Sequence, residues 1–257
     1  MADTFTLARR LKAGETVYTG WCSLPCPLLP EIIAREGFPA VTLDSQHGLW
    51  DTAAIVAGVA AVRQGGAAPI VRVPVGGFAS ISRALDFGAE GIIAPMINTE
   101  ADARALASFA KFPPIGERSW GPHRAMMLGG FTDQQVYLAE ANNLIVALAM
   151  IETRTALANI DAIASTPGVD GLFLGPSDLS IALSNGRTLD PLSKEVDAEI
   201  DRIIAAANKA GKIPGAYCHN AERAAALAKR GMRFIAVASD MMFLRAGAAA
   251  QLKMLKG

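Results

Sequence analysis

Eight short apolar segments alternate with longer segments of helical period, and this alternation is the strongest constraint on how the chain can fold. The predicted strands are 17–24, 40–45, 68–74, 91–97, 144–152, 171–176, 213–218 and 234–240. They are apolar on both faces, which is typical of buried parallel strands joined by crossover helices. Eight such units favour a closed (β/α)8 TIM barrel of class α/β, and the 257 residues match the roughly 250 that this fold usually needs. We therefore predict one barrel domain over residues 1–257.

The charge and hydropathy of the chain argue against nucleic acid and membranes as partners. Lys plus Arg and Asp plus Glu each total 24, so no overall field attracts polyanions. The longest apolar run, Leu144 to Ile151, is too short to span a bilayer, and the start Met1-Ala2-Asp3-Thr4 is not typical of a secretory signal. We expect a cytoplasmic protein that acts on small molecules.

The three cysteines do not suggest a disulfide framework or a zinc site. Three cysteines cannot all pair within one chain, and Cys22 and Cys26 lack the Cys-x-x-Cys spacing. No His/Cys cluster indicates a structural zinc ion. We expect buried free thiols.

Polar side chains follow four of the predicted strands, at the ends where barrel enzymes keep their chemistry. They are His47, Arg72, Glu152 and Asp178. Glu152 and Asp178 end adjacent strands, so their carboxylates can supply two oxygen ligands to Mg²⁺ or Mn²⁺. Each also has a structural explanation, because Asp178 can cap a helix over 179–183 and Glu152 can lie in the first turn of a helix over 153–164. Their occurrence together, beside Arg72, favours the metal site.

Arg72 and His47 are candidates for charge stabilisation and proton transfer. Arg72 interrupts an apolar strand, where a guanidinium needs a partner: either a structural ion pair or negative charge developing on a substrate carbonyl oxygen. His47 follows Asp44 by three residues, and a nearby carboxylate can orient its ring and raise its basicity, although a structural histidine is the alternative. His123 and His219 are weaker candidates.

Two connecting segments are further candidates for function. The turn Gly175 to Leu179 leads from a strand into a helix, and its free N–H groups suit a substrate carboxylate. Since it contains a single glycine, a small carboxylate fits it better than a nucleotide. The insertion from Pro113 to about Asn143 contains Arg118, Trp120 and His123 within 113–132, and is either a functional loop or a packing or interface loop. Its place after a helix and before a strand predicts the N-terminal face of the barrel.

At these residues the chain resembles the metal-dependent class II 2-oxo acid aldolases, the family of 4-hydroxy-2-oxoheptanedioate aldolase and 2-dehydro-3-deoxyglucarate aldolase. The matching segments span nearly the whole chain and are Glu31–Ala34, Thr42–Gly48, Val71–Pro74, Gly91–Met96, Met150–Thr153 and Gly171–Ser180. The resemblance implies Glu152 and Asp178 as metal ligands. It implies that Arg72 polarises the oxo group and that His47 and Asp44 are the proton-transfer pair. Substrate contacts are then expected from Arg72 and from Trp21, Gly175, Ser177 and Asp178.

The implied reaction makes or cleaves 4-hydroxy-2-oxo acids, with pyruvate or hydroxypyruvate as the enolate donor and an aldehyde as the acceptor. The implied cofactor is Mg²⁺ or Mn²⁺, with Co²⁺ as a further candidate. No Lys lies in the predicted strands, which argues against a Schiff-base route. The chain departs from the resemblance at Met150, where many relatives have Gln.

The resemblance also implies a hexamer in which a C-terminal helix, here Phe243 to Leu255, packs on a neighbouring subunit, and in which Asp86 approaches an adjacent site. Two other functions stay open. One is a CoA-ester lyase of the citramalyl or malyl type, and the other is a non-catalytic barrel that binds 2-oxo acids.

Overall fold

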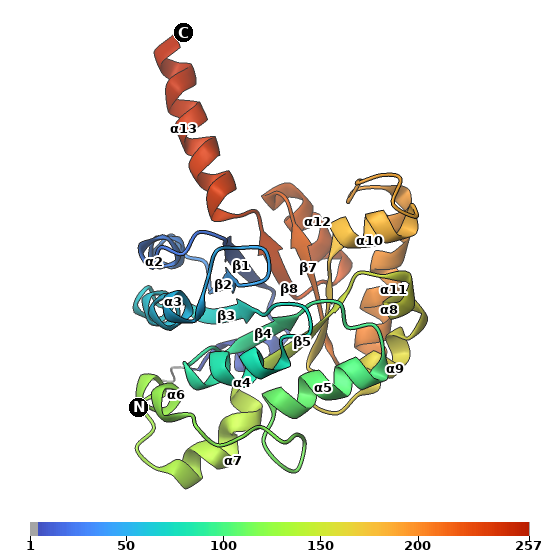
Figure 1. Ribbon diagram of the computed structural model, residues 1–257. Coiled ribbons are helices and arrows are strands. Elements are labelled where there is room, and N and C mark those ends of the chain that lie inside the picture. The colour runs from blue at the N-terminus through green and yellow to red at the C-terminus, as the bar shows by residue number, and fades with distance from the viewer. Residues whose placement is uncertain (1–4, 257) are drawn as a thin grey trace.

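The computed structural model describes residues 5–256 and forms a closed barrel of eight parallel strands in the order β1 to β8 (Figure 1). The strands are β1 Val17–Cys22, β2 Ala40–Asp44, β3 Ala68–Arg72, β4 Gly91–Ala94, β5 Val146–Ile151, β6 Gly171–Leu174, β7 Ile213–Cys218 and β8 Phe234–Val237. Parallel pairing of β8 with β1 closes the sheet. The predicted (β/α)8 TIM barrel is confirmed. The start of the chain, on which the expectation of no secretory signal rests, lies outside the described residues.

Seven of the eight predicted strands end earlier in the structure than the apolar pattern suggested. The segments predicted as 91–97 and 234–240 end at Ala94 and Val237. Soon after each end, the chain turns through a residue with positive φ, which is 55° at Met96 and 53° at Ala238. An apolar composition therefore continues beyond the regular sheet into the loops at the mouth of the barrel.

Helices surround the barrel and fill most of the connections between strands. They are α1 Leu7–Lys12, α2 Leu28–Arg35, α3 Thr52–Gln64, α4 Phe78–Asp86, α5 Glu100–Ala110, α6 His123–Gly129, α7 Gln134–Leu144, α8 Arg154–Ala158, α9 Ile160–Ser165, α10 Pro176–Leu183, α11 Lys194–Lys209, α12 Ala221–Arg230 and α13 Asp240–Lys256. Predicted end signals are present, as in the Thr99–Asp102 capping box of α5 and the left-handed Gly231 that ends α12.

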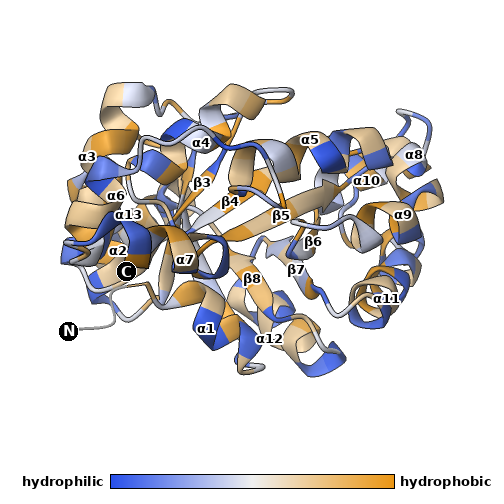
Figure 2. Ribbon diagram, turned by 90° about the horizontal axis from the view of Figure 1, so that it is seen from below, coloured by the Kyte–Doolittle hydropathy of each residue, from blue (hydrophilic) through white to orange (hydrophobic). Residues whose placement is uncertain are grey.

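The core has two main layers, one inside the barrel and one between the strands and the helices around them. Figure 2 shows strands that are mostly hydrophobic, with helices around them that mix hydrophobic and hydrophilic residues. Leu7 and Leu11 of α1 pack with the interior layer at the N-terminal end. At the other end the interior layer finishes in Trp21, Met150 and Phe173. These three side chains form the apolar floor of the mouth.

The insertion that precedes β5 contains α6 and α7, and it packs on α4 and α1 at the N-terminal end of the barrel. Tyr137 is buried in an aromatic cluster with Trp120 and Phe131. Arg118 donates to Asp86 at 2.6 Å. These contacts confirm the face predicted from chain order and support the packing alternative for this segment.

The last helix, α13, projects away from the barrel (Figure 1). Its residues from Met241 onward are exposed, including Phe243, Leu252 and Leu255. Among the described residues, no helix has the length and apolar character needed to cross a membrane.

The three cysteines are free thiols, as expected, but one of them is not buried. Cys22 and Cys218 are buried at the ends of β1 and β7, and burial raises the pKa of the Cys218 thiol to about 12. Cys26 is exposed because it lies in the loop after β1, outside the apolar strand pattern. The prediction of buried thiols was therefore wrong for Cys26.

Candidate active site

A cavity of about 220 Å³ opens at the mouth of the barrel, where the strands end. Six residues predicted from sequence line it, namely Trp21, His47, Arg72, Gly175, Ser177 and Asp178. The structure thus brings together side chains from β1, β3 and the segments that follow β2 and β6. Asp44 and Glu152 lie behind this lining, at 2% and 1% exposure.

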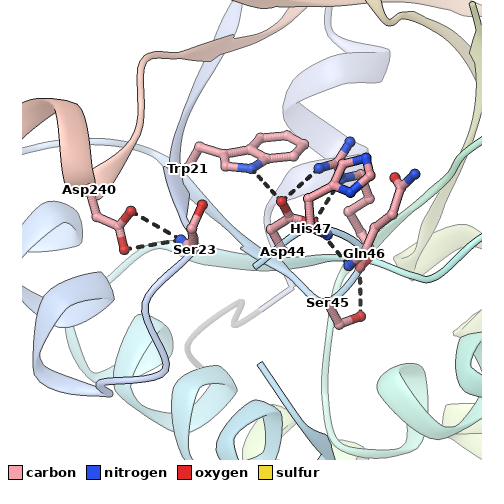
Figure 3. A network of polar contacts seen from close by, with 8 residues as sticks. Trp21, Ser23, Asp44, Ser45, Gln46, His47 and Asp240 are labelled. Carbon is pink, nitrogen blue, oxygen red and sulfur yellow. Dashed lines mark hydrogen bonds and ion pairs between the residues drawn. The ribbon is translucent and has the colours of Figure 1, made fainter. Parts of the chain in front are cut away.

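Asp44 and Arg72 form a buried two-point ion pair across neighbouring strands. Arg72 donates from Nε to Oδ1 at 2.9 Å and from Nη2 to Oδ2 at 2.6 Å. Trp21 donates from Nε1 to the same carboxylate at 3.2 Å, and its ring lies 4.8 Å from the guanidinium carbon (Figure 3). This geometry fixes the plane of the guanidinium, while Arg72 still lines the cavity. Arg72 can therefore form a structural ion pair and still face negative charge on a substrate oxygen, so the two alternatives predicted for it are compatible.

The Asp44 carboxylate also orders the loop that contains His47. It accepts from the backbone N–H of Gln46 at 3.0 Å and of His47 at 3.3 Å. Burial opposes the charge of Asp44, but the hydrogen bonds and charge of Arg72 hold the pKa of this carboxyl below its usual value. Asp44 thus stays ionised at neutral pH. The His47 side chain is exposed at the rim of the cavity.

Glu152 is held at the end of β5 by a contact that sequence patterns did not predict. Its Oε1 accepts from the backbone N–H of Met96 at 2.7 Å. Met96 has φ of 55°, a left-handed conformation that is costly for a residue with a side chain and that turns this N–H toward the carboxylate. Thr153 and Asn98 are hydrogen bonded through their side chains, which ties the same two loops together.

The structural explanations for the two carboxylates do not apply here. Thr153, rather than Glu152, caps α8, because its side chain accepts from the N–H of Ala156. The helix after β6 begins at Pro176, three residues earlier than predicted, so Asp178 lies in its first turn and makes no capping hydrogen bond. Asp178 is exposed in the cavity instead.

Glu152 and Asp178 are close enough to influence each other's ionisation. Burial is the largest cause that raises the pKa of Glu152, and the charge of Asp178 raises it further, to about 7. The Met96 N–H and the charge of Arg72 act in the opposite direction. Two carboxyl groups that repel each other at the end of adjacent strands form a favourable donor set for a hard cation.

The space beside this pair depends on Gly175. A Cβ atom at this position would overlap Oε2 of Glu152 and would lie 2.9 Å from Cε of Met150. Within residues 5–256 no cluster of three or more His, Cys, Asp or Glu side chains is arranged to hold a metal ion. An ion held here would therefore bind two protein carboxylates and keep other positions for water or substrate.

Further lining residues were not predicted from sequence as site residues. Ser23, Met150, Phe173, Pro176, Tyr217 and Ser239 complete the cavity wall. Phe173 and Met150 belong to apolar strand patterns that are equally typical of core residues. Ser23 comes directly after β1 and Ser239 lies two residues after β8, so the rule that strand ends meet at one face would have found them.

Comparison with known proteins shows the family of this chain. The model of the family described as HpcH/HpaI aldolase/citrate lyase matches residues 19–246. The chain belongs to this family. Within it, the chain is 41% identical over 235 residues to a hydroxypyruvate/pyruvate aldolase of Rhizorhabdus wittichii, which covers 91% of this chain and 92% of the relative. It is 36% identical over 244 residues to a 4-hydroxy-2-oxovalerate aldolase of Novosphingobium aromaticivorans, covering 93% and 89%.

A solved structure of this HpcH/HpaI family agrees with the fold. The family member from Burkholderia cenocepacia has a TM-score of 0.88 at 28% identity and covers 98% of this chain and 99% of its own. The similarity therefore extends over the barrel and its loops as well as the strand ends.

Proposed function

We propose that this chain is a divalent-metal-dependent aldolase that makes or cleaves 4-hydroxy-2-oxo acids, with pyruvate or hydroxypyruvate as donor and an aldehyde as acceptor. The observation that carries the proposal is the convergence of Glu152, Asp178, Arg72 and His47 at one barrel mouth. The two relatives described above are named as aldolases of such acids. The whole barrel, residues 1–257, would act as one catalytic unit.

Glu152 and Asp178 would hold the metal ion. Their mutual repulsion, the buried position of Glu152 and the space that Gly175 leaves beside Oε2 all fit a small hard cation. Oxygen ligands favour Mg²⁺ or Mn²⁺, and Co²⁺ is a further candidate. When bound, such an ion supplies Lewis acidity that polarises the 2-oxo group of the donor.

Arg72 would stabilise the negative charge that develops on the oxo oxygen. Its guanidinium lines the cavity in a plane fixed by Asp44 and by the Trp21 ring. A donor group that is already oriented costs no reorganisation when the C3 proton of the donor leaves. Asp44 thus acts on the substrate through Arg72.

The start of α10 would hold the donor carboxylate. Ser177 and Asp178 line the cavity in the first turn of this helix, where N–H groups have no partner within the helix, while Pro176 has no N–H. Trp21, Met150 and Phe173 form an apolar surface beneath, which would keep water away from the carbon that loses its proton.

His47 would transfer protons at the rim. Its ring lines the cavity and its backbone is fixed by Asp44, so the side chain would exchange a proton with C3 of the donor, and with the hydroxyl of a 4-hydroxy-2-oxo acid or the aldehyde oxygen. Asp44 accepts a hydrogen bond from the backbone N–H of His47. A direct role of Asp44 in proton transfer remains a prediction.

The first experiment is proton NMR of pyruvate, and separately hydroxypyruvate, in heavy water with Mg²⁺ or Mn²⁺ and then with chelator. Metal-dependent loss of the C3 signal is expected for an enolate-forming enzyme. Absence of exchange in protein shown to bind metal would favour the CoA-ester lyase or the non-catalytic binding protein. Cleavage of a citramalyl or malyl CoA ester would then separate those two.

We also propose a homo-oligomer, with the hexamer implied by the resemblance as the expected state. α13 exposes Met242, Phe243 and Leu255, and an apolar cavity of about 350 Å³ lies beside β1 and β8, bounded by Phe38 and Ala224 among others. Light scattering during gel filtration will measure the mass. The approach of Asp86 to a neighbouring site, and a cytoplasmic location, remain predictions.

A further inference from the structure

Asp240, the first residue of α13, is a buried carboxylate that the mechanism above does not use. It is 1% exposed. Its oxygens accept from the backbone N–H groups of Ser23 at 3.0 and 3.1 Å, of Leu24 at 2.9 Å and of Met241 at 2.8 Å. A buried carboxylate that binds backbone N–H groups fixes them firmly, because charge-assisted hydrogen bonds are stronger than neutral ones. Asp240 therefore joins the start of α13 to the loop after β1.

Ser23 links Asp240 to the loop that contains His47 through two backbone hydrogen bonds. While its N–H donates to Asp240, its carbonyl oxygen accepts from the N–H of Leu49 at 2.8 Å. Figure 3 shows Asp240 and Ser23 on one side of Trp21 and the His47 loop on the other. The contacts thus run from Asp240 through Ser23 to the backbone two residues beyond His47.

The two loops pack backbone against backbone at Gly48. A Cβ atom on Gly48 would overlap the carbonyl oxygen of Asp44 and would lie 3.0 Å from both Cα and O of Ser23. Such close packing leaves little freedom for either loop to shift alone. A displacement of Ser23 must therefore move the segment next to His47.

His47 is consequently held from two sides. Asp44 binds its own N–H, and the hydrogen bond from Leu49 to Ser23 fixes the segment that follows. We propose that Asp240 is a positioning residue for the reaction, which fixes the Ser23 loop and through it the placement of the His47 ring. Since α13 begins at Asp240, this contact also couples the direction of α13 to the site. The inference rests on the proposed function, in which His47 transfers protons.

The test is Asp240→Asn, which keeps the size of the side chain but replaces one acceptor oxygen by a donor that faces N–H groups. We expect metal-dependent C3 proton exchange of pyruvate to fall about 10- to 100-fold, because small misplacements of a catalytic group have effects of this size. The KM for pyruvate is expected to stay within about twofold, since the metal ligands and Arg72 are untouched.

A double-mutant cycle separates an effect of Asp240 on the position of His47 from a disturbance of the fold that does not depend on His47. If Asp240 acts through His47, Asp240→Asn will change the exchange rate by less than about twofold in a His47→Ala background. The same fold loss in both backgrounds, or no loss in the wild-type background, would overturn the inference. Asp133→Asn is the matched control, because Asp133 also accepts backbone N–H groups at a helix start but lies in the insertion at the other end of the barrel.

Further results separate misfolding of the variant and failure of the proposed function from failure of this inference. If Asp240→Asn does not reach the wild-type circular dichroism spectrum, Asp240→Glu, which keeps the charge, replaces it in the same cycle. Wild-type protein that binds metal but shows no exchange would overturn the proposed function and this inference together. Wild-type exchange with an unaffected Asp240 variant overturns the inference alone.

Discussion

Gly175 borders the proposed metal ligands, so its substitution by alanine tests the site without removing any polar group. The new methyl group would overlap Oε2 of Glu152 and crowd Cε of Met150 at 2.9 Å. Glu152 cannot easily turn away, because it is 1% exposed and its Oε1 is held by the Met96 N–H at 2.7 Å. Gly175→Ala should therefore displace a ligand while leaving both carboxylates in the chain.

The size of the effect follows from the required movement. Atoms essentially never approach a Cβ more closely than 3.0 Å, so Oε2 must move by at least about 0.7 Å. Mg²⁺ needs ligands in near-ideal octahedral positions, and disturbing the groups that orient metal ligands typically weakens binding 10- to 100-fold. We therefore expect the Kd for Mn²⁺ to rise about 10- to 100-fold, which corresponds to about 1.4–2.8 kcal/mol.

Isothermal titration of chelator-treated protein with Mn²⁺ measures this change. Gly247→Ala is the control, because a Cβ at Gly247 in α13 meets nothing within 4 Å, and its Kd should match wild type. Wild-type affinity in Gly175→Ala would show that Glu152 does not bind the ion in this position. The assignment of the metal ligands would then be wrong.

Three further predictions concern the residues around the pair. His47→Ala should keep metal and pyruvate binding but reduce C3 proton exchange about 10²- to 10⁴-fold, and unchanged exchange would remove His47 from the mechanism. Met96→Gly should raise the free energy of unfolding by about 1 kcal/mol in urea denaturation, because glycine adopts a φ of 55° without steric strain and keeps the backbone N–H. A lower free energy of unfolding would mean that the packing of the Met96 side chain outweighs the backbone strain. Burial raises the pKa of Glu152 from 4.5 to about 7. Protonation of Glu152 therefore favours the folded state, and this contribution to the free energy of unfolding is fully present below pH 4.5 and is lost as the pH rises through 7. In chelated protein the free energy of unfolding should fall over that range by at most about 1.4 kcal/mol per pH unit, and Glu152→Gln should flatten the slope.

The barrel and the position of its chemistry followed from sequence because both depend on regular repeats. Periodic apolar segments predicted every strand, and parallel pairing brings all strand ends to one face. The sequence alone therefore grouped Glu152, Asp178, Arg72 and His47 at one site. The same reasoning would also identify Ser23 and Ser239 as residues at the mouth of the barrel, although both resemble ordinary loop serines.

The contacts that hold these groups could not be predicted in the same way. Met96 belongs to an apolar segment, and its left-handed turn is set by how the chain leaves β4. Asp240 was included in the last predicted strand, yet it begins α13 and binds the loop after β1, more than 200 residues away. Such contacts depend on the exact end of each strand, which is the feature that apolar composition defines least.

The charge of the mouth further implies an order of binding. Asp44 offsets the charge of Arg72, so the carboxylates of Glu152 and Asp178 give the site a net negative charge when both are ionised. A 2-oxo acid is itself an anion, and like charges in a partly buried site repel strongly. A divalent cation would reverse this balance and add a ligand for the acid. We therefore expect calorimetry to detect pyruvate binding with Mg²⁺ present but not with chelator, and equal affinity in both conditions would contradict this electrostatic argument.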